Sequence, residues 1–275
     1  LASGNPALRR YRGFLGDPHG RLPEAEGGAM RSVLQYILSV VFIVQMYLAM
    51  AVYALWWTPL VLRRRDAAFD AVHAYCRWVR ASAALLVGLR SEVRGAVPSD
   101  EVVIAAKHQS FFDIIILVSA LPRPKFIMKK ELLWAPIVGW YATRIGCVPV
   151  DRGRRGEAMK KMVADVKAGL AQPGQLIIYP QGTRVAAGAR KPYKVGVGVL
   201  YSQLGQECVP VATNVGVFWP RHGILRRPGL AVVEFLPRIP AGLPVEDFME
   251  RIEPEIESAS DRLMAEAGFR GADEP

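Results

Sequence analysis

The longest hydrophobic segment of the chain lies close to its beginning. From Ser32 to Leu62, 31 residues follow one another without a charged side chain. As a helix this segment would be about 46 Å long, against a hydrocarbon core of roughly 30 Å in a lipid bilayer. It predicts a membrane helix that spans with tilt, or a helical hairpin that enters the bilayer and turns at Pro59. Trp56 and Trp57, followed by three arginines, are typical of a membrane interface.

The rest of the chain alternates between helical and strand spacing. Apolar residues recur every three or four positions from Ala67 to Leu89, which predicts a helix that ends near Gly88. Short β-branched runs predict strands at 102–106, 125–128, 145–150, 175–179, 208–215 and 230–235. Helical spacing predicts helices at 157–170, in the residues before Leu204, and at the C-terminus, where Pro254 interrupts the pattern. This alternation predicts an α/β fold.

These patterns divide the chain into four parts. Residues 1–29, rich in Gly, Pro, Ala and Arg, predict a disordered tail, and residues 30–90 predict membrane-associated helices. Residues 91–245 predict the α/β domain, and residues 246–275 a C-terminal helix and tail. The chain opens with Leu, and Met30 stands directly before the first patterned segment. We therefore expect Met30 to be the natural start of the protein.

Composition and charge narrow the class of partner. Hydrophobic residues make up 51% of the chain and the net charge is +10, so we expect an anionic partner, either lipid or nucleic acid. The basic and aromatic segment 218–227 fits a membrane-facing loop at least as well as a nucleic-acid contact. Because the charges are dispersed and the N-terminal segment belongs in lipid, no nucleic-acid partner is expected. Cys76, Cys147 and Cys208 are too far apart for a zinc cluster or a disulfide framework, which favours a reducing compartment.

Candidate chemistry begins at the end of the predicted strand 102–106. His108 follows this strand, and Asp113 comes five residues later, directly before another apolar run. Loops at strand ends are exposed above a rigid sheet, where α/β proteins place reactive groups. If a helix begins near Ser110, Asp113 can reach back to one imidazole nitrogen and leave the other as a general base. The spacing alone is a weak signal, because most such pairs have no catalytic role.

A second group of polar residues follows the predicted strand 175–179. Gln181, Gly182, Thr183 and Arg184 stand in sequence at its end. Glycine allows the backbone to approach a ligand closely, threonine offers a hydroxyl, and the planar guanidinium of arginine suits a phosphate. These residues predict a binding loop for a phosphorylated molecule.

Together these segments resemble the lysophosphatidic acid acyltransferases (1-acyl-glycerol-3-phosphate acyltransferases) of the glycerolipid acyltransferase group, over roughly residues 102–215. The first block of that family, His-x-x-x-x-Asp, matches His108 and Asp113. The remaining three blocks match in the family's order at Lys130, Glu131, Leu132, Pro136, Gly139, Gly146, Asp151 and Arg152, then at Gly182, Thr183 and Arg184, then at Val209, Pro210 and Val211. Four blocks in order are far more specific than any one of them.

Two positions depart from the family pattern. Lys107 stands before the histidine, where Asn is usual, and Gln181 opens the third block, where Glu is usual. Glutamine keeps the size and the hydrogen-bonding reach of glutamate but loses its charge. The role of position 181 is therefore open. Lys107 is expected either to attract the phosphates of a donor or to be an ordinary solvated side chain.

The resemblance implies a fold and a reaction. The fold is glycerol-3-phosphate-acyltransferase-like, an α/β fold with a mixed sheet flanked by helices. A fatty acyl group would pass from acyl-CoA or acyl-carrier protein to the 2-hydroxyl of 1-acyl-glycerol 3-phosphate, giving phosphatidic acid in phospholipid biosynthesis. His108 would be the general base and Asp113 would orient it. Ser110 is not needed as a nucleophile, because a thioester is already activated. The acceptor-binding candidates are Arg184 first, with Gly182, Thr183 and Gln181 in its loop, then Lys130 and Arg152; a structural pair with Asp151 explains Arg152 about equally well.

The remaining expectations concern location and alternatives. No cofactor or metal is expected beyond the acyl donor, and the basic run 63–65 after the apolar segment places the enzyme at the cytoplasmic face of the inner (plasma) membrane. The alternatives are another acceptor (glycerol 3-phosphate, another lysophospholipid or a lyso-ornithine lipid) or a non-catalytic lipid-binding membrane module, with Gln181 as a sign of decay. Intact His108 and Asp113 argue against the second alternative.

Overall fold

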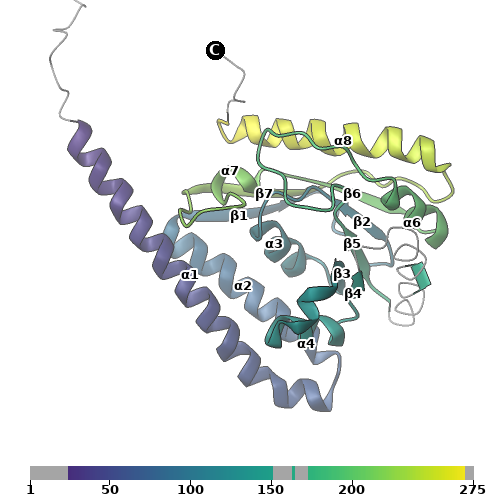
Figure 1. Cartoon of the computed structure of the whole chain (residues 1–275), viewed down its shortest axis with the longest axis horizontal. Coiled ribbons are helices and arrows are strands. Elements are labelled where there is room, and N and C mark those ends of the chain that lie inside the picture. The colour runs from purple at the N-terminus through teal and green to yellow at the C-terminus, as the bar shows by residue number, and fades with distance from the viewer. Residues whose placement is uncertain (1–23, 151–162, 165–172, 270–275) are drawn as a thin grey trace, which may run out of the picture.

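The N-terminal part of the chain is a pair of packed helices. The computed structural model describes residues 24–150, 163–164 and 173–269. Helix α1 (Glu24–Arg63) and helix α2 (Ala67–Val87) run antiparallel and side by side (Figure 1). The predicted turn at Pro59 is wrong, because α1 continues through Pro59 and the chain reverses at residues 64–66. Helix α2 ends as predicted at Gly88, which adopts the left-handed conformation (φ 70°).

Helix α1 has the length and composition of a membrane helix. The segment Met30–Arg63 has a mean hydropathy of 2.1, and only 22% of its most apolar part is buried in the protein. Leu55 and Trp56 expose 78% and 80% of their surface. The opposite side of α1, with Phe42 and Met46, packs into the core. Its start at Glu24 precedes the predicted boundary at residue 30.

Seven strands form the predicted mixed sheet. They are β1 (Leu89–Arg94), β2 (Val103–Ala106), β3 (Pro124–Lys129), β4 (Val148–Val150), β5 (Gln175–Ile178), β6 (Cys208–Thr213) and β7 (Gly229–Phe235). Their order across the sheet is β1-β7-β6-β2-β5-β3-β4. Strands β6, β2, β5, β3 and β4 are parallel, whereas β7 and β1 run in the opposite direction.

Helices cover both faces of the sheet. The helices that connect strands are α3 (Phe112–Ala120), the 3₁₀ helix η2 (Lys130–Trp134), α4 (Pro136–Arg144), α6 (Gly196–Leu204) and α7 (Val215–Phe218), and α8 (Val245–Glu266) follows the last strand. Figure 1 shows α2 and α3 on one side of the sheet and α8 on the other. The predicted helix at 157–170 lies outside the described residues except for 163–164, which are helical.

The side chains of β2 show why two helical layers are needed. Ile104 and Ala106 point into the core shared with α1, α2 and α3, whereas Val103 and Ala105 point into the core shared with α6 and α8. All four are fully buried, because successive residues of a strand face opposite sides of a sheet. A strand buried on both faces holds its carboxyl end rigidly.

The C-terminal helix α8 belongs to this core. It runs through Pro254 without a break, so the predicted interruption there is wrong. Phe248, Ile252 and Ile256 are fully buried against α6 and the sheet. This packing compensates for the single backbone hydrogen bond that a proline removes from a helix. The residues predicted as a separate C-terminal part therefore complete the α/β domain.

Candidate active site

The polar residues singled out from the sequence gather at one edge of the sheet. Strands β2, β5 and β3 are parallel neighbours, so their carboxyl ends lie at the same edge. His108 follows β2, Gln181 and Arg184 follow β5, and Lys130 follows β3. Arg152, with Asp151, follows β4 but lies outside the described residues. The sheet thus brings together segments that are far apart in sequence.

His108 and Asp113 are in direct contact. The imidazole Nδ1 lies 2.9 Å from Asp113 Oδ1. Helix α3 begins at Phe112 and places Asp113 in its first turn, so the carboxylate points back to the end of β2 as the spacing predicts. The Asp113 side chain is 1% exposed, whereas that of His108 is 13% exposed. The pair is therefore sheltered, but the imidazole reaches the surface.

Asp113 is fixed through its second oxygen. Oδ2 accepts hydrogen bonds from the backbone N–H of Gln109 (2.8 Å) and of Ser110 (2.7 Å). An ionised carboxylate that is held this way can only accept from His108, so Nδ1 carries the proton and Nε2 keeps a free lone pair. The Ser110 hydroxyl is fully buried and accepts the N–H of Phe112 at 3.2 Å. It is occupied in this turn and is not placed as a nucleophile.

The ring of Tyr179 packs against the face of the His108 imidazole. Its ring stacks on that of His108 with 3.9 Å between the centroids and 18° between the planes. The ring of Phe126, on β3, is near parallel to that of Tyr179, with 6.4 Å between the centroids. Burial first, and then the charge of Asp113, raises the pKa of Tyr179 well above its usual value, and the hydroxyl has no hydrogen-bond partner among the described residues. We infer that Tyr179 acts through its ring. Sequence reasoning treated it only as a strand residue.

The loop after β5 is tied to the histidine. Val185 N–H donates to His108 C=O at 2.8 Å, which brings the segment 182–184 beside the His–Asp pair. Gly182 has φ of 68°, a left-handed conformation that residues other than glycine rarely adopt, so glycine fits here best. Thr183 and Arg184 are partly exposed. No carboxylate among the described residues pairs with the Arg184 guanidinium, so its charge is available to a ligand.

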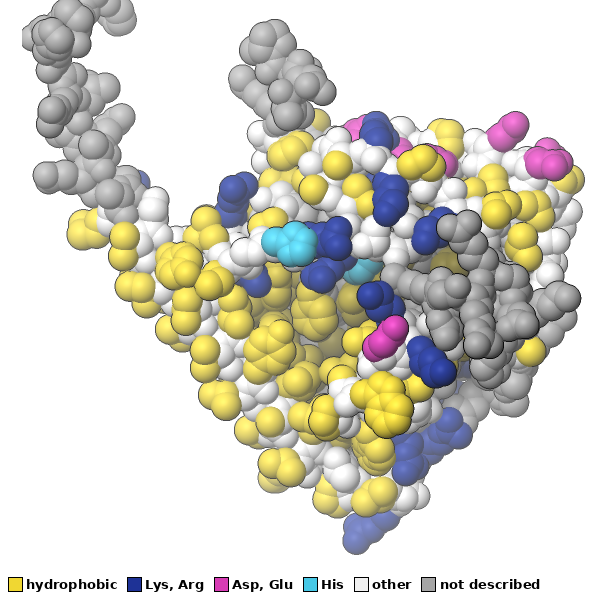
Figure 2. Space-filling model, in the orientation of Figure 1, with side chains coloured by type: hydrophobic (Ala, Val, Ile, Leu, Met, Phe, Trp, Pro, Cys, Tyr) yellow, Lys and Arg dark blue, Asp and Glu magenta, His cyan; other side chains and the backbone are white. Residues whose placement is uncertain are grey.

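The surface around this edge combines cationic and apolar side chains. Figure 2 shows Lys and Arg side chains gathered around a hollow in which a His side chain is visible. Below and to the left of the hollow, hydrophobic side chains predominate and continue along α1. Phe111, next to the His–Asp pair in sequence, and Trp134 of η2 are 37% and 85% exposed. A molecule with an anionic head and an apolar tail matches this combination.

Comparison with known proteins agrees with this geometry. Residues 90–214 match the model of the family described as Acyltransferase. Residues 90–214 belong to the acyltransferase family. A 1-acyl-sn-glycerol-3-phosphate acyltransferase of Pseudomonas aeruginosa is 28% identical over 76% of this chain and 83% of its own length. The human 1-acyl-sn-glycerol-3-phosphate acyltransferase alpha is 33% identical over 59% of each chain.

The fold has a close counterpart among solved structures. The crystal structure of the 1-acyl-sn-glycerophosphate (LPA) acyltransferase from Thermotoga maritima matches with a TM-score of 0.71. The match covers 84% of this chain and 98% of that chain at 19% sequence identity, so it concerns the fold. The α/β fold and the family resemblance predicted from the four sequence blocks are confirmed. The chain is an acyltransferase, and the apolar helix α1 indicates membrane association.

Two residues of the acyltransferase domain lie elsewhere than expected. Lys107 is only 2% exposed and its Nζ is bound by the Glu257 carboxylate, so the prediction of a phosphate-attracting or solvated lysine is wrong. Gln181 is 1% exposed, and its Nε2 donates to Lys191 C=O at 3.3 Å. Its side chain therefore faces the protein interior instead of a ligand. Lys130 is exposed at the start of η2.

The cysteines and metal-binding side chains add no further chemistry. Burial raises the pKa of the Cys76 and Cys147 thiols to about 12, so both are neutral and unreactive at neutral pH. Among the described residues there is no group of three or more His, Cys, Asp or Glu side chains that could hold a metal ion. The described part of the acyltransferase therefore presents one candidate catalytic group, the His108–Asp113 pair.

Proposed function

We propose that this acyltransferase moves a fatty acyl group from acyl-CoA or acyl-carrier protein to the 2-hydroxyl of 1-acyl-glycerol 3-phosphate, giving phosphatidic acid. One observation supports this most strongly: a His–Asp pair at hydrogen-bonding distance lies beside a loop whose arginine, Arg184, pairs with no carboxylate of the residues that the structure describes. The named activities of the bacterial and human relatives agree with it.

The chemistry requires a base and needs no covalent enzyme intermediate. His108 Nε2 takes the proton from the acceptor hydroxyl as its oxygen attacks the thioester carbonyl carbon. The tetrahedral intermediate then collapses, the C–S bond breaks, and the imidazolium returns the proton to the departing thiolate. Asp113 holds Nδ1–H and stabilises the imidazolium while it exists. No other proton carrier and no cofactor is required for this balance.

The acceptor is proposed to bind by both of its ends. Arg184 binds the phosphate with its planar fork, and Thr183 lies next to it in the same loop. Lys130, at the end of the neighbouring strand, adds positive charge to the same edge. The acyl chain of the acceptor lies along the apolar surface that continues from the hollow to α1. Arg152 is a further candidate for the phosphate.

Helix α1 is proposed to hold the enzyme on the membrane. Its apolar outer side enters the lipid, and its packed side keeps the domain close to the bilayer surface. The exposed residues Arg63, Arg64 and Arg65 at its end favour the anionic cytoplasmic face of the inner membrane. The active site then meets lysophospholipids that are already in the bilayer.

An acceptor panel tests the proposed function. Purified enzyme receives acyl-CoA or acyl-carrier protein together with 1-acyl-glycerol 3-phosphate, glycerol 3-phosphate, a neutral lysophospholipid or a lyso-ornithine lipid, and release of free thiol is followed. We expect turnover with 1-acyl-glycerol 3-phosphate to exceed that with each other acceptor. If only another acceptor is turned over, that acceptor is the substrate in place of 1-acyl-glycerol 3-phosphate. If no mixture consumes thioester, the protein is a non-catalytic lipid-binding module.

A further inference from the structure

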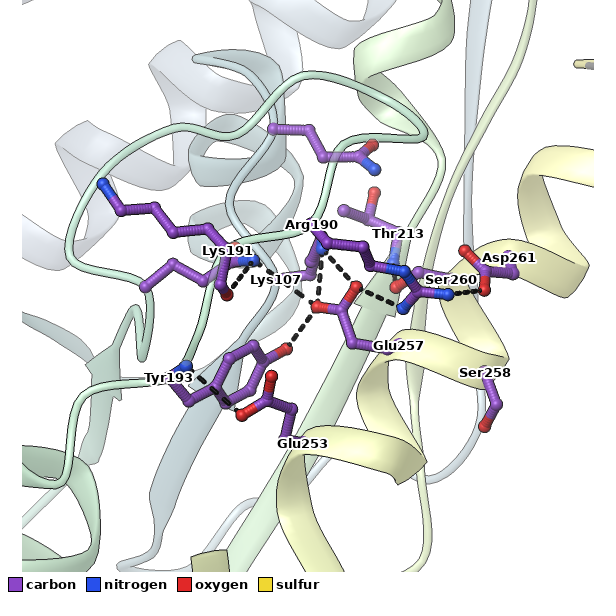
Figure 3. A network of polar contacts seen from close by, with 12 residues as sticks. Lys107, Arg190, Lys191, Tyr193, Thr213, Glu253, Glu257, Ser258, Ser260 and Asp261 are labelled. Atoms are coloured by element: carbon purple, nitrogen blue, oxygen red, sulfur yellow. Dashed lines mark hydrogen bonds and ion pairs between the residues drawn. The ribbon is translucent and has the colours of Figure 1, made fainter. Parts of the chain in front are cut away.

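A buried ion pair lies directly behind the His–Asp pair. Lys107, the residue before His108, extends its Nζ to both oxygens of Glu257, at 2.5 and 2.6 Å. The side chains of Lys107 and Glu257 are 2% and 9% exposed. Glu257 stands on α8, 150 positions further along the chain. Figure 3 shows this carboxylate pointing from α8 toward the loop that follows β5.

The same carboxylate also binds the loop after β5. Arg190 Nη1 donates to Glu257 Oε2 at 2.8 Å, and the Tyr193 hydroxyl donates to Oε1 at 2.9 Å. Gln181 Nε2 approaches Oε1 at 3.5 Å. Glu257 thus joins the first residues of this loop, its last residues and the end of β2 at one point (Figure 3). Arg184 lies between these attachments.

The network explains the two departures from the family pattern together. A glutamate at position 181 would place a second carboxylate close to Glu257, at about the 3.5 Å that now separates Gln181 Nε2 from Oε1. Two negative charges at this distance in a buried site repel each other strongly. A lysine at 107, in turn, requires a buried anionic partner. Both departures, Lys107 and Gln181, are therefore compatible with the carboxylate on α8.

We propose that Glu257 supplies, from α8, the carboxylate that the third sequence block lacks at Gln181, and that it is a positioning residue for the Arg184 loop. This inference rests on the proposed function, in which Arg184 binds the acceptor. Glu257 acts on the loop through Arg190, Tyr193 and Gln181. The His108–Asp113 contact is made within 108–113 and does not pass through Glu257.

The consequence is a specific kinetic signature. When the Glu257 charge is lost, the loop loses its central acceptor and Arg184 no longer occupies one position. The affinity for the acceptor then falls, whereas the His–Asp pair and the proton transfer it performs are largely retained. A defect in the positioning of Arg184 therefore raises the acceptor KM more than it lowers kcat.

Swapping the side chains of Gln181 and Glu257 tests whether Glu257 positions the Arg184 loop. Gln181→Glu, Glu257→Gln and the double variant Gln181→Glu/Glu257→Gln are compared with the wild type, each below its melting temperature. Each single variant should raise the acceptor KM roughly tenfold or more, which is the size expected for a lost charge-assisted hydrogen bond. The double variant returns one carboxylate to the network, and its KM should fall back to within about threefold of the wild type.

A matched control and a second variant keep the outcome decisive. Glu255→Gln removes a carboxylate from the same helix that pairs with exposed Arg251 and not with the loop residues named above, so it should leave KM unchanged. If Glu257→Gln does not fold, Lys107→Met/Glu257→Gln removes both buried charges and should fold with a raised KM. The inference is wrong if Gln181→Glu has the wild-type acceptor KM, or if the KM of Gln181→Glu/Glu257→Gln is as high as that of the worse single variant. It is also wrong if Lys107→Met/Glu257→Gln has the wild-type acceptor KM.

Hydrogen exchange separates this inference from the proposed function. In Glu257→Gln, residues 181–193 should exchange faster than in the wild type, whatever acceptor the enzyme uses. Failure of the wild type to acylate 1-acyl-glycerol 3-phosphate overturns the proposed function alone, and the kinetic series is then run with the acceptor found in the panel. Unchanged exchange in residues 181–193 overturns the role of Glu257.

Discussion

The two oxygens of Asp113 have different partners, and this decides which nitrogen of His108 acts as the base. Oδ2 is held by two backbone N–H donors and Oδ1 faces Nδ1. In Asp113→Asn the amide oxygen must keep the two N–H donors, so the NH₂ group turns toward Nδ1. Nδ1 then has to accept, the proton moves to Nε2, and the base is lost.

Asp113→Asn should therefore lower kcat about 10²- to 10⁴-fold and change the melting temperature little, because the backbone hydrogen bonds remain. The measurement is acyl transfer in parallel with thermal unfolding. His108→Ala should lower kcat at least as much. Wild-type turnover in either variant would contradict the assigned base.

Arg184 is expected to bind the phosphate of the acceptor. Arg184→Ala should raise the acceptor KM about 10- to 100-fold with a smaller change in kcat, because a charged hydrogen bond to phosphate contributes about 1.5–3 kcal/mol. Arg184→Lys should recover only part of this, since an ammonium lacks the planar fork. Arg251→Ala, an exposed arginine on α8, is the matched control and should leave KM unchanged. If Arg184→Ala leaves the acceptor KM unchanged, another basic side chain binds the phosphate.

The site residues that the sequence predicts make contacts local in sequence, whereas Tyr179 and Glu257 reach the site through tertiary packing. His108 and Asp113 are five positions apart, so a single turn of chain brings them together and their contact is predictable. Tyr179 and Glu257 reach the same site only through the pairing of β2 with β5 and the packing of α8. Nothing in the spacing of the sequence indicates those contacts. The departures at Lys107 and Gln181 were the one signal that a distant partner exists.

At the scale of elements, periodicity predicted which segments are strands and helices but not how they are arranged. The strand order places β7 between β1 and β6, and no local pattern encodes it. Pro59 and Pro254 are typical of helix breaks, yet α1 and α8 continue through them. Helix α1 packs along α2, and α8 packs against α6 and the sheet. Long-range packing outweighs one missing hydrogen bond.

Helix α1 is expected to be the apolar contact with the membrane. Leu55 and Trp56 are the most exposed apolar residues of its outer side, and replacing both with Asp places two charges where lipid is expected. Leu55→Asp/Trp56→Asp should lower binding to phospholipid vesicles at least tenfold without unfolding the domain, as measured by co-sedimentation and thermal melting. The control is Val195→Asp at the start of α6, where an exposed apolar residue has no expected role in lipid binding. Equal binding of wild type and double variant would exclude α1 as the membrane contact.

The whole molecule combines two attractions to a membrane that respond differently to salt. The net charge of +10 favours anionic lipid, and this attraction is screened within about 10 Å at 0.1 M salt. Burial of the apolar side of α1 does not depend on ionic strength in this way. The charge is spread over the chain, so it attracts the protein to a surface without defining one site.

Raising salt from about 0.05 M to about 0.5 M should therefore weaken binding to anionic vesicles severalfold, down to a residual level similar to that on neutral vesicles. The residual binding belongs to α1, so Leu55→Asp/Trp56→Asp should remove it while keeping the salt-sensitive part at low ionic strength. Vesicle co-sedimentation of both proteins on neutral and anionic lipid, over this salt range, measures the two contributions separately. If binding to anionic vesicles did not change with salt, the positive charge would have no part in membrane attachment, and the basic side chains around the hollow would serve only the substrate and the donor.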